Sequence, residues 1–239
     1  AYGLWNENYL PAGEMIENTS TNRIRSHNPG LEETGWVYSN VNVDWTPSNI
    51  EIAPDGITKC PKITDTTSNS RHSIAHTTTS AQTSGSWNSW SFWIKSEGTN
   101  RIHLELGNQG SIYSAVGMTF DTAVTDPNTG IVTGLIGSTF KDSLVVEHPN
   151  GWYHVRFNTI ASSNASTYYY FALKDDAGAI SYTGDGSKGI WLWGVQLEFG
   201  RYWPSSLITT TENEITRASD QFDDPTAVRY EDMARVEKR

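Results

Sequence analysis

Residues 89–95 read SWSFWIK, and this stretch decides the fold class. Its apolar residues alternate with a second set that combines an indole ring with polar groups: Trp90, Phe92 and Ile94 against Ser91, Trp93 and Lys95. Neighbouring side chains of a β-strand point to opposite faces of its sheet. The alternation therefore predicts a strand with one face in a hydrophobic core and an aromatic, polar face outside it.

The same period of two recurs in three further stretches: Ile102, Leu104 and Leu106 against Arg101, His103 and Glu105; Tyr153, Val155 and Phe157 against Trp152, His154 and Arg156; Tyr169, Phe171 and Leu173 against Tyr168, Tyr170 and Ala172. Short runs bounded by Gly, Pro, Asn and Asp predict strands at 71–76, 89–95, 101–106, 115–120, 131–136, 143–146, 152–160, 167–174 and 190–198. No interior window carries a sustained apolar stripe of helical period. We predict an all-β fold, an antiparallel jelly-roll sandwich of two sheets.

Turn signals support antiparallel pairing of these strands. DPNTG at 126–130 and HPNG at 148–151 predict hairpin turns, because Asn, Gly and a Pro in second position favour the required backbone angles.

Three regions are expected along the chain. They are an N-terminal arm at 1–22, the sandwich at 23–220, and a polar tail or connector at 221–239 whose charge order suits a helix.

Composition and charge exclude several classes of protein. The chain has 239 residues, 36% of them hydrophobic, which is enough for a self-supporting core. A net charge of -10 argues against nucleic acid or an anionic membrane as the main partner, since like charges repel. A single cysteine, Cys60, excludes internal disulfides and cysteine-rich zinc sites. We expect no membrane insertion and no signal peptide, because no long apolar run or basic leader is visible.

The outward residues of the predicted strands combine rings with hydrogen-bonding groups. A sugar ring has an apolar C–H face and a fringe of hydroxyls, so a site for it needs aromatic platforms flanked by fixed donors and acceptors. The candidate carbohydrate-binding residues are Trp93, Arg101, His103, Glu105, Trp152, His154, Arg156, Tyr168, Tyr170 and Gln196. Two other interpretations stay open: cover of these rings by the N-terminal arm or a sister subunit, and ordinary packing at a solvated surface.

Signatures of catalysis are missing from the sequence. It contains no GxSxG or HExxH motif, no phosphate-binding loop and no dinucleotide glycine fingerprint. A sandwich glycosidase needs two carboxylates about 5 to 10 Å apart. The nearest candidates, Glu105 and Glu198, are single acids on separate predicted strands. We therefore expect a protein that is not an enzyme.

No cofactor is expected, although two places could hold a structural calcium. Asp185 in YTGDGSKG and the 126–128 turn offer carboxylate and carbonyl oxygens, and both also fit ordinary turns. His72 and His76 share a face, and His103 and His154 are candidate cross-strand neighbours. A zinc site needs three or four ligands, so these histidines are better interpreted as hydrogen-bonding groups.

The last third of the sandwich region carries a recognisable pattern. GIWLWGVQLEFGRYWPSSLITTTENEITRASD, residues 189–220, resembles the closing strand of a jelly-roll domain common in bacteriophage tail-fibre and other virion proteins, which reads roughly WGAQLExG, PSSYIPT and TRAAD. Upstream, GWVYSNVNV, APDGITKCPKITD, WSFWIKSEG and NGWYHVRF resemble further elements of the same family, in the same order. The resemblance covers about 23–220.

This family is similar in fold to concanavalin-like lectins and carbohydrate-binding modules, which implies two antiparallel sheets and glycan recognition by a sheet face or rim loops. The matching positions are Gly194, Gln196, Glu198, Pro204, Ser205, Ser206 and Arg217. The resemblance implies mainly structural roles for them: Gly194 allows close approach of the sheet, and Gln196 satisfies backbone groups near its edge. The chain departs from the pattern at Leu207, at Thr209, and at Cys60 with Pro61.

The resemblance and the outward rings lead to one functional expectation. We expect a noncatalytic protein on the exposed surface of a virion, a fibre or capsid decoration element that binds host or environmental polysaccharide. Homo-oligomerisation, with a trimer as one arrangement, would raise the avidity of weak single sites. The alternative is an architectural virion protein whose aromatic face and terminal arms contact other virion subunits.

Overall fold

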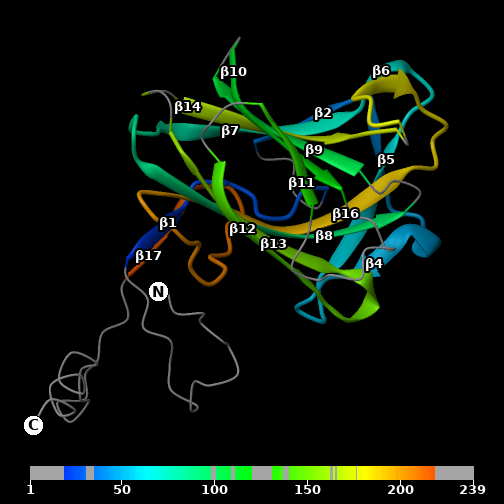
Figure 1. The fold of residues 1–239 in the computed structure, drawn as a ribbon. Helices are drawn as coiled ribbons and strands as arrows, with labels where there is room; N and C mark the ends of the chain where they lie inside the picture. The colour runs from blue at the N-terminus through cyan, green and yellow to red at the C-terminus, as the bar shows by residue number, and fades with distance from the viewer. Residues whose placement is uncertain are drawn as a thin grey trace, which may run out of the picture. The chain divides into compact units, whose positions relative to one another are not determined.

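The computed structural model describes residues 19–30, 35–97, 101–108, 111–119, 131–136, 140–161, 164, 166–175 and 177–218 (Figure 1). Of these, residues 101, 103–108, 111–119, 131–136, 140–143 and 166–169 are described by their backbone alone. One compact unit spans Thr21–Thr216. The predicted arm up to residue 18 and the predicted tail lie outside the described residues.

Two large antiparallel sheets make up the compact unit. The six-stranded sheet has the order β11 (Ile131–Ile136), β10 (Ser111–Thr119), β9 (Arg101–Asn108), β14 (Ser166–Leu173), β7 (Ser73–Ala81), β2 (Trp36–Ser39). The seven-stranded sheet has the order β12 (Phe140–Glu147), β13 (Tyr153–Ile160), β8 (Trp87–Glu97), β16 (Gly189–Phe199), β5 (Lys59–Asp65), β3 (Val41–Asp44), with β4 (Ile50–Ile52) also paired to β5. The chain crosses repeatedly between the sheets, and the predicted all-β sandwich is confirmed (Figure 1).

Short elements complete the described part of the chain. β6 (Asn69–Arg71) pairs with β15 (Ser181–Thr183), and β1 (Ser20–Asn22) pairs with β17 (Ile215–Arg217). Two 3₁₀ helices, η2 (Pro47–Asn49) and η3 (Pro149–Gly151), lie in loops. No helix of the described residues is long and apolar enough to cross a membrane.

All nine predicted strands exist, with ends that differ by a few residues. The HPNG turn is also confirmed: Asn150 takes a positive φ of 67°, and β12 pairs with β13 on either side of it. The DPNTG turn lies outside the described residues. The strands β1 to β4, β6, β15 and β17 were not predicted, apart from Arg71 of β6, because they have only three or four residues. β5 was not predicted because its sequence, KCPKITD, shows no regular alternation.

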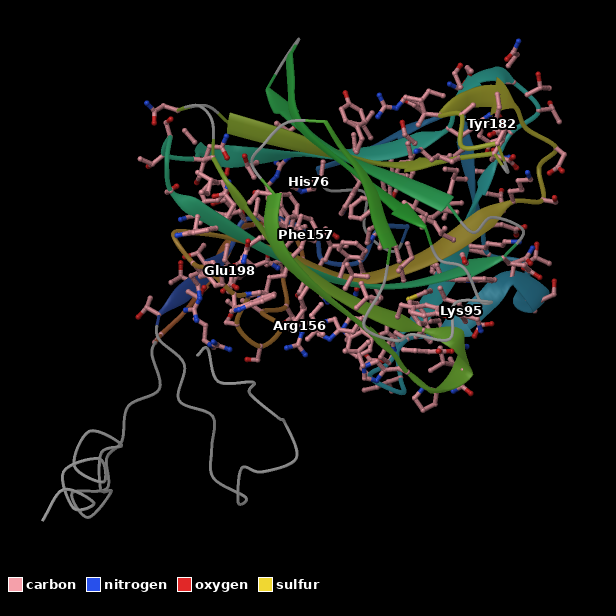
Figure 2. The ribbon with its side chains drawn as sticks, viewed as in Figure 1. His76, Lys95, Arg156, Phe157, Tyr182 and Glu198 are labelled. Atoms are coloured by element: carbon pink, nitrogen blue, oxygen red, sulfur yellow. The ribbon has the colours of Figure 1, made fainter. Side chains whose placement is uncertain are left out.

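The core lies between the sheets and follows the predicted alternation. Trp90, Phe92 and Ile94 of β8 are buried in it, as are Val155 and Phe157 of β13. Figure 2 shows Phe157 between the layers and Arg156 on the opposite side of the seven-stranded sheet. Burial of each large side chain contributes about 1.5–3 kcal/mol.

Aromatic contacts join the two layers of the core. Phe92, on the seven-stranded sheet, meets Phe171 of the six-stranded sheet edge-on, with ring centroids 5.1 Å apart. Trp90 stacks on Phe157 at 5.6 Å within its own sheet. The Phe92–Phe171 contact thus packs the two sheets against each other.

A β-bulge in β16 changes which residues face outward. Trp193 pairs with Trp93, but the next pair is Gln196 with Ser91, so β16 has one extra residue here. Gly194 takes a φ of +63°, which a glycine adopts without strain. The bulge keeps Val195 in the core, and it leaves Gln196 on the outer side of the sheet.

Candidate functional site

The ten predicted site residues divide between the two sheets. Arg101, His103 and Glu105 lie on β9, and Tyr168 and Tyr170 on β14, both in the six-stranded sheet. The others belong to the seven-stranded sheet or border it: Trp93, Trp152, His154, Arg156 and Gln196. The prediction of one mixed face is therefore wrong, and so is that of His103 as a cross-strand neighbour of His154. Alternation shows which residues share a side of one strand, but not which sheet the strand joins.

On the six-stranded sheet, one predicted side chain is described. Tyr170 is half-buried, with the Arg71 guanidinium 4.5 Å from its ring centroid. The side chains of Arg101, His103, Glu105 and Tyr168 lie outside the described residues. Their contribution to a site stays a prediction.

On the outer face of the seven-stranded sheet, two predicted residues form a ring stack. His154 of β13 pairs in register with Trp93 of β8, and their rings are parallel within 2° with centroids 4.1 Å apart. His148, next to the η3 turn, meets Trp93 edge-on at 4.5 Å. All three side chains are half-buried, so the stack contributes both to packing and to the surface.

Arg156 extends this stack along β13. Its Nε and Nη2 donate to Nδ1 of His154, at 3.4 and 3.3 Å. Burial, followed by the nearby charges of Arg156 and His148, lowers the pKa of His154 to about 3. The imidazole is therefore neutral at physiological pH, and the guanidinium beside it supplies the positive charge.

Trp152 is a correction to the predicted site. It is 2% exposed and packs with Trp191 and Trp193 on the outer side of the sheet. Residues 45–58, called the flap below, cover it: its Nε1 donates to the Ile52 carbonyl at 3.1 Å. A distant segment of the chain occupies the place where a sugar would have to lie, which no local pattern indicates.

Gln196 is a second correction, because it is completely buried. Its Oε1 accepts from the Ile208 N–H at 2.6 Å, and its Nε2 donates to the carbonyls of Ser205 and Ser206 at 3.3 Å each. It is not available to a ligand. It has instead the structural role that the family resemblance implied.

Glu198 holds the same segment. Its two carboxylate oxygens accept from the backbone N–H and the hydroxyl of Ser205, both at 2.6 Å. Gln196 and Glu198 thus tie residues 201–210 onto the outer face, which explains the spacing of the QLE and PSS motifs. Glu105 lies on the other sheet, so the two acids that a glycosidase would need are not on one face.

Two exposed rings on this segment were not predicted as site residues. Tyr202 is 42% exposed and Trp203 is 37% exposed, with their ring centroids 5.8 Å apart. The Tyr202 ring meets Trp87 edge-on at 4.6 Å, and its carbonyl accepts from Asn158 Nδ2 at 3.0 Å. Trp87 is on the same side of β8 as Trp93, and Asn158 is on the same side of β13 as Arg156, because each pair is an even number of residues apart. The Tyr202 and Trp203 rings therefore lie on the same outer face as the Trp93–His154 stack. The sequence signal was the aromatic pair between Gly200 and Pro204 at a strand end.

Further apolar side chains are exposed on the flap. Trp45 is 44% exposed and Ile57 is 80% exposed, and Ile52 between them is similarly open. Large exposed apolar patches mark contact surfaces, so the flap is a candidate contact surface.

The described residues of the candidate calcium and histidine sites have the following surroundings. Asp185 accepts from the Ser187 N–H at 2.8 Å, as in a turn, and His72 and His76 are buried. The 126–128 turn lies outside the described residues. In the described part of the chain, no three His, Cys, Asp or Glu side chains come together as metal ligands.

Comparisons with known proteins add no argument about function. No protein-family model and no curated protein sequence matches the chain. Among solved structures, a protein of Bacteroides thetaiotaomicron that has been proposed to bind sugar is 12% identical, with 78% of this chain and 95% of that chain covered. The TM-score is 0.25, so this likeness supports neither a fold family nor a ligand.

Proposed function

We propose that this protein is a noncatalytic glycan-binding domain of a virion surface protein, a fibre or decoration element that attaches to host or environmental polysaccharide. One observation carries the glycan part: the Trp93–His154 stack lies beside Arg156 on an outer sheet face. The virion part is supported by the motifs in 23–220 that resemble tail-fibre domains. We propose the exposed surface of the particle as its location.

The chemistry of this surface suits a sugar. An indole and an imidazole offer apolar ring surface to the C–H face of a pyranose, and a guanidinium offers several N–H donors to its hydroxyls. Because His154 is neutral, the stack does not depend on protonation in the physiological range. A single site of this kind binds weakly, and display of several copies in an oligomer would raise the avidity.

A panel of bacterial surface polysaccharides, tested with the whole chain on an array and then by calorimetry, tests the proposal. We expect binding that falls about tenfold or more in Trp93→Ala and Arg156→Ala, with folding checked by circular dichroism. Arg71→Ala is a matched control, because it removes an arginine beside a ring on the other sheet. The proposal is wrong if the panel gives no signal, or if all three variants bind like the parent.

The exposed flap favours a second candidate, an architectural role in subunit assembly. Trp45, Ile52 and Ile57 would then be covered by a neighbouring subunit. Sedimentation at increasing concentration tests this, with Ile57→Ser as the variant. Assembly that Ile57→Ser weakens supports the role, and a monomer at every concentration argues against self-assembly through this flap.

A further inference from the structure

We propose that the outer face of the seven-stranded sheet binds several consecutive sugar units of a polysaccharide, with Tyr202 and Trp203 as a second platform. This inference rests on the proposed function and defines the ligand of that site more closely. A terminal sugar would need only the first platform, the Trp93–His154 stack.

The register of β13 sets the length of the binding strip. His154, Arg156 and Asn158 lie on the same face at every second position. A strand rises about 3.3 Å per residue, so His154 and Asn158 are about 13 Å apart. The ring stack marks one end of this strip. At the other end Asn158 is buried and holds the carbonyl of Tyr202, so the exposed surface there is that of Tyr202 and Trp203. Arg156 lies between the two aromatic groups.

Residues 202–207 follow the strip along its length. Tyr202 contacts Trp87 and Asn158 at one end, and Ser205 is bound to Glu198 at the same level. Ser206 and Ile208 are bound to Gln196, one step nearer the ring stack. Leu207 then packs against the same outer cluster of buried side chains as Trp93 does. The segment therefore borders β8 and β13 from the far platform to the near one, over the adjacent strand β16.

The second platform is exposed although its loop is firmly held. Glu198 fixes the loop through Ser205, and Asn158 and Trp87 fix it through Tyr202. Ordering a mobile loop would reduce the affinity of any ligand, and a loop already held avoids that loss. Two rings in contact with each other, each more than a third exposed, thus offer a ligand apolar surface on a fixed support.

The test uses oligosaccharides of defined length, from monomer to hexamer, cut from a polysaccharide that binds the whole chain. We expect affinity to rise with length until both platforms are covered, with a total gain of about tenfold or more over the shortest binding ligand. Trp203→Ala should remove that gain and leave short ligands unaffected. Arg156→Ala should weaken binding at most lengths.

Trp45→Ala is the matched control, because Trp45 is about as exposed as Trp203 but lies on the flap. It should leave the length dependence unchanged. If affinity is already maximal for one unit, or if Trp203→Ala has no effect or the same effect as Trp45→Ala, the strip is refuted while the proposed function stands. If the parent chain binds no glycan of any length, both are refuted.

Discussion

Lowering the pH from 7.5 to 5.0 should destabilise the fold through two histidines, His76 and His154. Burial is the main cause that lowers the pKa of each to about 3, and a nearby arginine adds to it: Arg25 for His76, and Arg156 for His154. The His76 ring accepts a hydrogen bond at Nε2 from the Arg25 N–H, at 3.2 Å. A proton on that nitrogen would remove the acceptor.

The sign and size of the effect follow from linkage. In the unfolded chain a histidine has its ordinary pKa of about 6.5, so below that pH the unfolded state binds more protons than the folded state. The stabilisation is complete above pH 6.5 and is lost as the pH falls toward 3. Between pH 6.5 and 3 each histidine lowers the free energy of unfolding by about 1.4 kcal/mol per pH unit. At pH 5.0 the free energy of unfolding is therefore lower by about 2 kcal/mol for each histidine and by about 4 kcal/mol for both.

Urea unfolding followed by tryptophan fluorescence, at pH 7.5 and 5.0 and constant ionic strength, measures this difference. The carboxylates with a lowered pKa, such as Asp44 and Glu214, titrate below their ordinary values near 4 and stay outside this window. His76→Gln and His154→Gln should each reduce the pH dependence by about half. Equal stability at both pH values, or imidazole NMR signals of both residues that titrate near pH 6.5, would refute the reasoning.

Three further results are expected. Glu198→Ala should cost about 1–3 kcal/mol in urea unfolding, because it removes the acceptor of the Ser205 N–H and one of the two acceptors of the Ser205 hydroxyl, and a loss within 0.5 kcal/mol of zero would contradict this. Gly194→Ala should lower the melting temperature, since a Cβ at φ +63° would lie 3.2 Å from Trp93. Burial raises the pKa of the Cys60 thiol to about 12, so a thiol reagent at pH 8 should label the unfolded chain only; rapid labelling of the native protein would be the contrary result.

The fold was predictable because alternation is a local signal. In the middle of β8 and β13 every second residue is apolar, and the core buries these residues: Trp90, Phe92, Ile94, Val155 and Phe157. The bulge at Gly194 was harder to predict, because a single extra residue shifts the alternation without changing the composition of the strand. The short strands near the flap depend on pairing with β5, which is a contact between distant parts of the chain.

The site was predictable only in part. Trp93, His154 and Arg156 meet on one face because their strands are neighbours, a fact that the alternation of each strand does not contain. Trp152 was assigned to the surface by the same rule, and Gln196 was included for its hydrogen-bonding groups, but the flap and residues 201–210 cover them. Which outward residues stay open is decided by segments far away in sequence. Prediction of such a site therefore needs the tertiary contacts.

Thr21 and Thr216, the boundaries of the compact unit, are joined by a hydrogen bond of 2.7 Å between their hydroxyls. The two ends of the compact unit are therefore close together. The sandwich could be inserted into an exposed loop of another protein without strain in either connection. The same adjacency allows circular permutation, with a short linker that joins the old ends and a new opening in a surface loop. The sandwich can in this sense be transferred to another protein as one unit.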